Sequence, residues 1–158
     1  MPVSETDGDP FAEVQPSAPP DRPPIESLDP KWMAEFEGML YIGYLEDEYE
    51  VYGHRIRLKT LTTDDELEIS LLIKPWEGTM GSVRAYQTAM CAATIVSVDG
   101  QPLPQPLTSA PADTPLRNAF DYLRANYRPP VINMIYEKIL LLETRVGHIL
   151  DAMGKVRG

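Results

Sequence analysis

Few side chains in this sequence have the chemistry of an active site. The 158 residues include two histidines, His54 and His148, and one cysteine, Cys91. Neither histidine has a Cys, Asp or Glu at the spacing of a metal-binding motif, so no metal site and no cofactor are predicted. His54 is expected to be a solvated turn residue, and Cys91, in an alanine-rich stretch, a small buried apolar residue.

The segment 78–82 is glycine-rich and superficially resembles a phosphate-binding loop. It lacks the lysine and the full spacing of a P-loop, and it does not follow a predicted strand. We interpret it as the entry to a helix, with Thr79 or Ser82 as the cap. No serine lies in a G-x-S-x-G nucleophile elbow. With no converging nucleophile, base and acid, the sequence predicts a protein that is not an enzyme and has no catalytic residues.

The formal net charge of −10 argues against several kinds of partner. A surface that binds a nucleic-acid duplex needs clustered Lys and Arg to displace counterions, and this sequence has no such cluster. No apolar run reaches the roughly 18 residues that span a bilayer. The N-terminus also lacks the basic and apolar regions of a secretory signal. We therefore expect an intracellular or particle-associated protein that binds neither nucleic acid nor membrane.

Residues 1–29 differ in composition from the rest of the chain. The first 30 residues contain eight of the sixteen prolines, and seven acidic residues against one basic residue, Arg22. Such a segment cannot bury enough apolar surface to offset the entropy of ordering it. The sequence therefore predicts an extended or disordered acidic, Pro-rich arm over 1–29 and a single compact domain over 30–158.

The fold predicted for that domain is α+β and mainly helical, with one β-hairpin and about four helices. Capping residues, prolines and apolar spacing indicate where the helices begin and end. The helix that is rich in alanine is expected at the centre of the domain, because small side chains let neighbouring backbones approach closely. The four helices are expected at about 63–74, 79–98, 114–127 and 130–155.

Capping signals are clearest at two of these helices. Thr63 begins an apparent capping box, and Thr114-Pro115 combines a capping hydroxyl with proline in the first turn. In the helix over 63–74, the side chains expected to face inward are Leu67, Leu71 and Leu72.

A shorter helix is predicted before the hairpin. Asp29-Pro30 combines an acidic N-cap with proline at the first helical position. The turns that follow carry Trp32, Met33 and Phe36 on one side, and Gly38 is expected to end the helix.

The hairpin is predicted over 48–59, with Gly53-His54 as a two-residue turn. This register puts apolar side chains on one face and two acid–base pairs on the other. The expected cross-strand pairs are Tyr52 with Arg55, Val51 with Ile56, Glu50 with Arg57, Tyr49 with Leu58, and Glu48 with Lys59.

The strongest periodic signal lies in the last helix, where apolar residues follow a heptad rhythm. These residues form one stripe, and they are the candidate partner-binding residues: Ile132, Ile135, Ile139, Leu142, Val146, Ile149 and Met153. As a coiled coil, the stripe would make a homo-oligomer seam. Further apolar residues beside it, such as Leu140 and Leu150, widen it beyond what a seam needs. We therefore interpret the helix as two-sided, with one side completing its own domain and another offered to a second chain.

Several runs of sequence are similar to the tail assembly chaperones of tailed bacteriophages, particularly those of actinobacterial hosts. The similarity covers about residues 36–156. It is carried by residues 36–45, 52–54, 58–62, 84–86 and 97–103, and by Tyr136, Glu143 and Arg145 in the last helix.

This resemblance implies a small, mainly helical protein without a catalytic site. Members of the family bind the tape measure protein and tail-tube subunits in the host cytoplasm during tail assembly. They typically also have a longer product made by ribosomal frameshifting. The acidic arm keeps a second interpretation open, in which the protein is a structural component of the virion, in the tail tip or baseplate, and its arm docks on neighbouring subunits.

Overall fold

The computed structural model describes residues 43–106 and 113–156, with side chains in the last helix described as far as residue 152. Its fold is α+β and mainly helical, as the sequence predicts. The predicted arm over 1–29 and the short helix after Asp29-Pro30 lie outside the described residues. The elements are β1 (Glu46–Val51), β2 (His54–Lys59), α2 (Thr63–Ile73), the 3-10 turn η2 (Lys74–Trp76), α3 (Ser82–Thr94), β3 (Ile95–Val98), α4 (Pro115–Asn126) and α5 (Pro129–Val156).

The described strands form an antiparallel sheet in the order β1-β2-β3. The expected helix over 79–98 is therefore wrong at its C-terminal end, since α3 stops at Thr94 and Ile95–Val98 is a strand. This strand is rich in β-branched residues, which favour extended backbone. It pairs with β2, about forty residues earlier in the chain, through Ile56↔Val98 and Arg57↔Ser97. Pairing across such a separation is invisible to a local pattern.

The hairpin forms, but its turn and register differ from the prediction. The turn residues are Tyr52 and Gly53, with φ of 49° and 79°. Positive φ at both central positions is the geometry of a type I′ turn, whose twist matches that of the flanking strands. The predicted turn at Gly53-His54 is wrong, and His54 is instead the first residue of β2.

The observed register is displaced by two residues from the predicted one. A displacement of two leaves every side chain on its predicted face, because side chains alternate with a period of two. The change adds a third acid–base pair on the solvent face. The observed acid–base partners are Glu46↔Lys59, Glu48↔Arg57 and Glu50↔Arg55.

The N-caps of the helices lie close to the predicted positions. In α2 the cap is Thr62 rather than Thr63, because Thr62 and Asp65 exchange reciprocal backbone-to-side-chain hydrogen bonds of 2.9 and 3.1 Å. At α4 the prediction is confirmed, since Thr114 Oγ1 accepts from the Arg117 N–H. The N-cap of α3 is Gly81 and has no side-chain hydrogen bond. The expected capping by Thr79 or Ser82 is therefore wrong.

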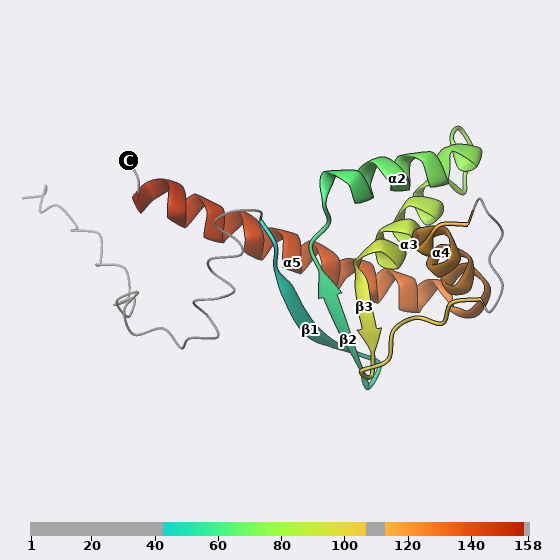
Figure 1. Cartoon of the computed structure of the whole chain (residues 1–158), viewed down its shortest axis with the longest axis horizontal. Helices are drawn as coiled ribbons and strands as arrows, with labels where there is room; N and C mark the ends of the chain where they lie inside the picture. Colours follow the sequence, from blue (N-terminus) through green and yellow to red (C-terminus); the bar gives the residue numbers. More distant parts are fainter. Residues whose placement is uncertain (1–42, 107–112, 157–158) are drawn as a thin grey trace, which may run out of the picture.

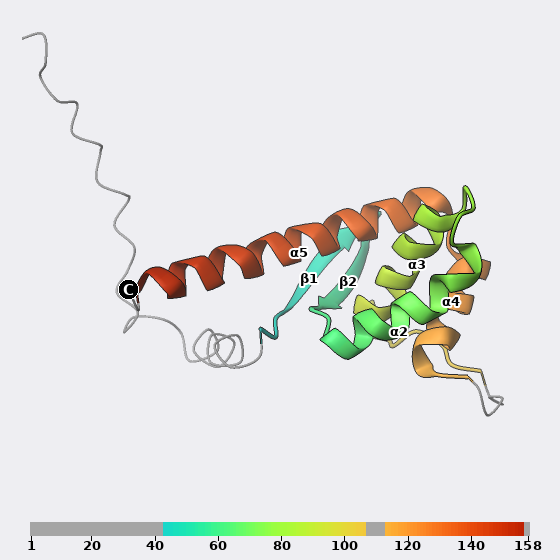
Figure 2. The same cartoon turned by 90° about the horizontal axis from the view of Figure 1, so that it is seen from above.

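The core is built around α3, which packs against α2, α4 and α5. Its buried alanines, among them Ala85 and Ala89, confirm the expected central position. Figures 1 and 2 show α2, α3 and α4 grouped toward the end where α5 begins, with β1 beside the middle of α5. No helix among the described residues is both long enough and apolar enough to cross a membrane.

The inward face of α2 differs from the prediction. Ile69 and Leu72 are buried, whereas Leu67 and Leu71 are 59% and 70% exposed. The buried positions follow one stripe of the helix that faces α3, and Leu67 and Leu71 lie on the opposite side. The interpretation of these two leucines as core residues is therefore wrong.

The turn geometry predicts the effect of two substitutions in the hairpin. Tyr52 is exposed and has a left-handed backbone that non-glycine residues rarely adopt, and Asn adopts that conformation more readily. Tyr52→Asn should therefore stabilise the fold by up to about 1 kcal/mol in urea unfolding. Gly53→Ala should destabilise it by about 1 kcal/mol, because alanine is strained at positive φ. A destabilised Tyr52→Asn variant would contradict this account of the turn.

Candidate functional site

The apolar stripe of α5 is divided between two environments. Its first four residues, Ile132, Ile135, Ile139 and Leu142, are no more than 3% exposed and belong to the core of this chain. Val146 and Ile149 are partly buried at the margin of that core. The side chain of Met153 lies outside the described residues. The sequence left two roles open for the stripe. Its first four residues pack in the chain's own domain.

The C-terminal turns of α5 continue past the strands (Figures 1 and 2). Here the partly buried Val146 and Ile149 lie beside Leu150, which is 45% exposed. We call these three residues the distal face. A partly exposed apolar helix face at the margin of the core is a surface that a second helix can cover.

The distal face begins next to an ion pair that joins β1 to α5. Arg145 Nη1 donates a hydrogen bond to Asp47 Oδ2 in a partly exposed ion pair. Burial raises the pKa of the neighbouring Tyr49, Asp47 raises it further, and Arg145 opposes the shift. Leu45, immediately before β1, is buried. The start of β1 is therefore fixed against α5 one residue before Val146.

An aromatic contact joins α3 to α5. The rings of Tyr86 and Tyr136 meet edge to face with centroids 6.4 Å apart. Burial raises the pKa of Glu143 on the same side of α5, and the nearby Glu66 of α2 raises it further.

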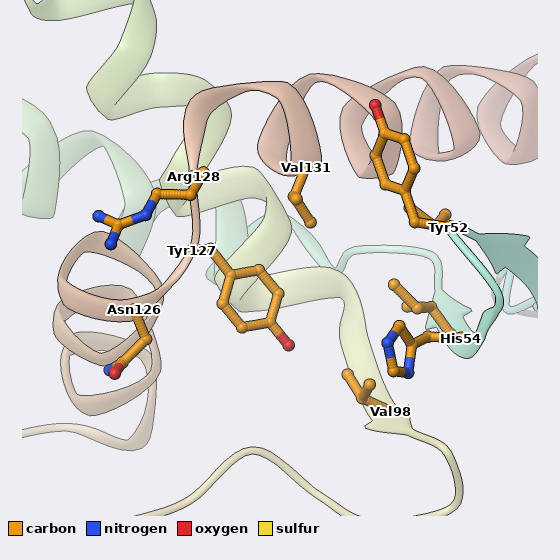
Figure 3. Close-up of a pocket in the computed structure, with 9 residues that line it drawn as sticks. Tyr52, His54, Val98, Asn126, Tyr127, Arg128 and Val131 are labelled. Carbon is orange, nitrogen blue, oxygen red and sulfur yellow. The ribbon is translucent and has the colours of Figure 1, made fainter.

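The tip of the hairpin borders a cavity of about 370 Å³. Its lining comes from the hairpin tip, the end of β3 and the junction between α4 and α5: Val51, Tyr52, His54, Ile56, Val98, Asn126, Tyr127, Arg128 and Val131. In Figure 3 the side chains of Tyr127 and His54 point into the cavity from opposite sides, whereas Arg128 points away from it. The cavity thus joins an apolar floor to a phenol and an imidazole.

The imidazole of His54 in this cavity contacts the carboxylate of Asp99, the residue that follows β3. His54 Nδ1 lies 2.7 Å from Asp99 Oδ2, and the Arg55 N–H donates to Asp99 Oδ1 at 2.9 Å. These hydrogen bonds, led by that of His54, hold the pKa of Asp99 below its ordinary value. His54 is exposed as expected, but it is a strand residue with a side-chain partner. No motif pointed to Asp99 beyond its place before Gly100, which marks a turn.

The cavity lining lacks the side chains that most often act as nucleophiles beside a histidine. A base oriented by a carboxylate serves nucleophilic catalysis when a hydroxyl or thiol lies within its reach, and the lining contains no Ser, Thr or Cys. Cys91 is buried elsewhere, and burial raises the pKa of its thiol to about 12, which keeps it protonated. Within residues 43–106 and 113–156, no three His, Cys, Asp or Glu side chains gather as a metal site.

Comparison with known proteins found no relative of this chain. No protein-family model matches the chain, and neither a curated protein nor a solved structure matches it.

The division of α5 predicts opposite outcomes for two aspartate substitutions. Ile139→Asp places a charge in the core and should cost more than about 3 kcal/mol, enough to unfold the domain. Leu150→Asp lies on the distal face and should change the free energy of unfolding by less than about 1 kcal/mol. Circular dichroism during urea unfolding measures both. A folded Ile139→Asp monomer would show that this part of the stripe is an oligomer seam.

The His54–Asp99 contact predicts a dependence of stability on pH. Because the fold lowers the pKa of Asp99, the ionised carboxylate stabilises the folded state above the ordinary carboxyl range. That contribution is lost as the pH falls through the lowered pKa. Asp99→Asn should therefore have a lower melting temperature at neutral pH, and its difference from the natural chain should close in acid. The control is Asp151→Asn, on an exposed part of α5, and a constant difference at every pH would contradict the argument.

Proposed function

We propose that this protein is a non-enzymatic factor of phage tail morphogenesis that binds an apolar helical segment of another tail protein through the distal face of α5. The observation that carries the proposal is the division of one 28-residue helix between core and surface. The resemblance to tail assembly chaperones supplies the partner class, namely the tape measure protein or subunits of the tail tube or tail tip.

The physics of the distal face suits reversible binding. The first half of α5 is held by the core, so the second half is already helical before a partner arrives. Preorganisation of this kind lowers the entropy cost of association. The area offered by a few side chains is well below that of a permanent interface. A partner is therefore held weakly enough to be released, as an assembly factor requires.

The acidic arm favours a second candidate function, a structural virion protein whose arm docks on neighbouring subunits. The first 30 residues carry a net charge of −6, which suits a basic groove between subunits. Mass spectrometry of purified particles separates the two candidates. Many copies per particle support the structural role, and absence from the particle supports the chaperone.

Co-expression with the tape measure protein tests the leading proposal. The natural chain should increase the soluble fraction of that partner and co-purify with it. Leu150→Asp should abolish both effects, because it places a charge at the centre of the binding surface. Leu71→Asp is the matched control, since Leu71 is an exposed leucine on α2, away from the distal face. Equal loss in both variants, or no complex with the natural chain, would refute the proposal.

A further inference from the structure

The outer side of β1 is an open edge of the described sheet. In the strand order β1-β2-β3, β1 pairs on one side only, and Figure 1 shows it as the outermost strand. Backbone groups of an antiparallel strand point alternately toward its partner and away from it. The Thr60 N–H donates to the Leu45 carbonyl oxygen at 2.9 Å, so Leu45 and every second residue after it face β2. The outward backbone groups therefore belong to Glu46, Glu48 and Glu50.

The described chain leaves most of these outward groups unpaired. The Glu48 N–H donates to Asp47 Oδ1 at 2.9 Å. Within residues 43–106 and 113–156, no hydrogen bond reaches the outward N–H of Glu46 or Glu50. A row of free N–H and C=O groups on an edge strand is a template to which an extended segment can add. The outer edge of β1 is therefore a surface that can bind the backbone of another segment.

Charge on the edge strand decides which segment can pair with it. Four of the six residues of β1 are acidic and none is basic. Arg57 of β2 lies 2.5 Å from Glu46, and Arg55 lies 4.0 Å from Glu48. Glu50 is exposed and forms no ion pair within the described part of the chain. A strand added at this edge would lie next to the acidic row, with the arginines one strand further away, so it should carry basic side chains.

The same charges disfavour two other occupants of the edge. Two copies of β1 paired edge to edge would set acidic residues against acidic residues, which destabilises a sheet. Residues 1–30 of this chain contain seven acidic residues and one basic residue, so they meet the same repulsion. A basic extended segment of another protein meets neither obstacle.

The two faces of β1 predict the residue pattern of that segment. The glutamates of β1 lie on the solvent face, whereas Tyr49 lies on the face toward α5 and packs against the core. Residues directly opposite each other on neighbouring strands share a face. A residue opposite Glu48 or Glu50 is therefore on the solvent face, and the next one lies beside Tyr49. Aromatic and β-branched side chains stabilise each other as cross-strand neighbours. The expected segment thus alternates basic and apolar residues.

We propose that the outer edge of β1 binds, as an additional antiparallel strand, an extended segment of a partner protein in which basic and apolar residues alternate. Its backbone pairs with the outward groups of Glu46 and Glu50, and its basic side chains lie beside Glu48 and Glu50. Its apolar side chains lie beside Tyr49. This surface goes beyond the proposed function, because it takes a strand on the sheet and needs no helix on the distal face.

Two N-methylated peptides test the proposal with the full chain. The probe is a fluorescent hexapeptide in which lysine and valine alternate. In the proposed pairing the lysines stand opposite the outward glutamates, so their N–H groups point to β1 and those of the valines point away. Methylating the valine nitrogens should change the affinity by less than about twofold, whereas methylating the lysine nitrogens should weaken it by about tenfold or more. Both peptides keep every positive charge, and fluorescence anisotropy at low salt measures their binding.

Substitutions at Glu50 test the same hydrogen bonds from the side of the protein. Glu50→Pro removes the outward N–H, and proline is tolerated on an edge strand where that group faces solvent. It should weaken binding of the unmethylated peptide by about tenfold, and Glu50→Gln, which keeps the N–H, should weaken it less. Glu137→Gln removes an exposed carboxylate of α5 and should leave the affinity unchanged. Circular dichroism checks that each variant is folded, and the peptide pair needs no variant.

Three outcomes would overturn the proposal. Equal affinity for the two methylated peptides would show that charge alone attracts them. Failure of the unmethylated peptide to bind would exclude a basic strand as the occupant. Self-association of the natural chain in sedimentation that Glu50→Pro abolishes would make a second copy the occupant. Discrimination between the methylated peptides, together with the loss in Glu50→Pro, would support it.

Discussion

The rest of the structure depends on the burial of the first half of α5 against α3 and the sheet. Each large side chain buried there contributes about 1.5–3 kcal/mol, and Ile135, Ile139 and Leu142 are almost fully enclosed. Close approach of α3 is possible because small residues face α5, as shown by Cys91 Sγ, which lies 3.7 Å from the Ile132 carbonyl oxygen. A polar contact secures the start of the helix, where Arg84 donates to Asn133 Oδ1 at 2.6 Å. The helix is thus the frame to which the sheet and the other helices attach.

The same helix becomes less stable where it leaves this frame. Gly147 follows the clamp at Arg145, and a Cβ added there would meet no atom within 4 Å. Its missing side chain is therefore not required for close packing, and it weakens the helix by about 1 kcal/mol relative to alanine. The distal turns have fewer tertiary contacts to offset that loss. A partner that packs on these turns therefore stabilises them.

Much of this fold was predictable from interactions between residues that are close in the sequence. The parts that were missed depend on pairing between residues that are far apart in the sequence. Caps such as Thr114 act within four residues, so the helix ends were found to within a few positions. The strand at Ile95–Val98 exists because β2 lies beside it, and nothing near Ile95 in the sequence encodes that neighbour. The hairpin register was missed for a different reason. A shift of two residues leaves each side chain on the same face of the hairpin, so only the turn distinguishes the two registers. In this turn Tyr52 adopts a left-handed backbone that its side chain does not favour. The contact between His54 and Asp99 follows from that register and from β3, and was equally beyond a local reading.

The place where α5 turns from core to surface is set by the length of β1, and not by any change in the sequence of α5. The hairpin tip shares a cavity with Val131, and the start of β1 is clamped at Arg145. The six residues of β1 extend over about 20 Å at a strand's rise per residue. From Val131 to Arg145 the helix advances by about 21 Å at 1.5 Å per residue. The strand therefore spans the enclosed part of the helix and ends where the distal face begins. Because the heptad rhythm continues unbroken through this point, periodicity alone could not separate the residues that fold the domain from those that are offered to a partner.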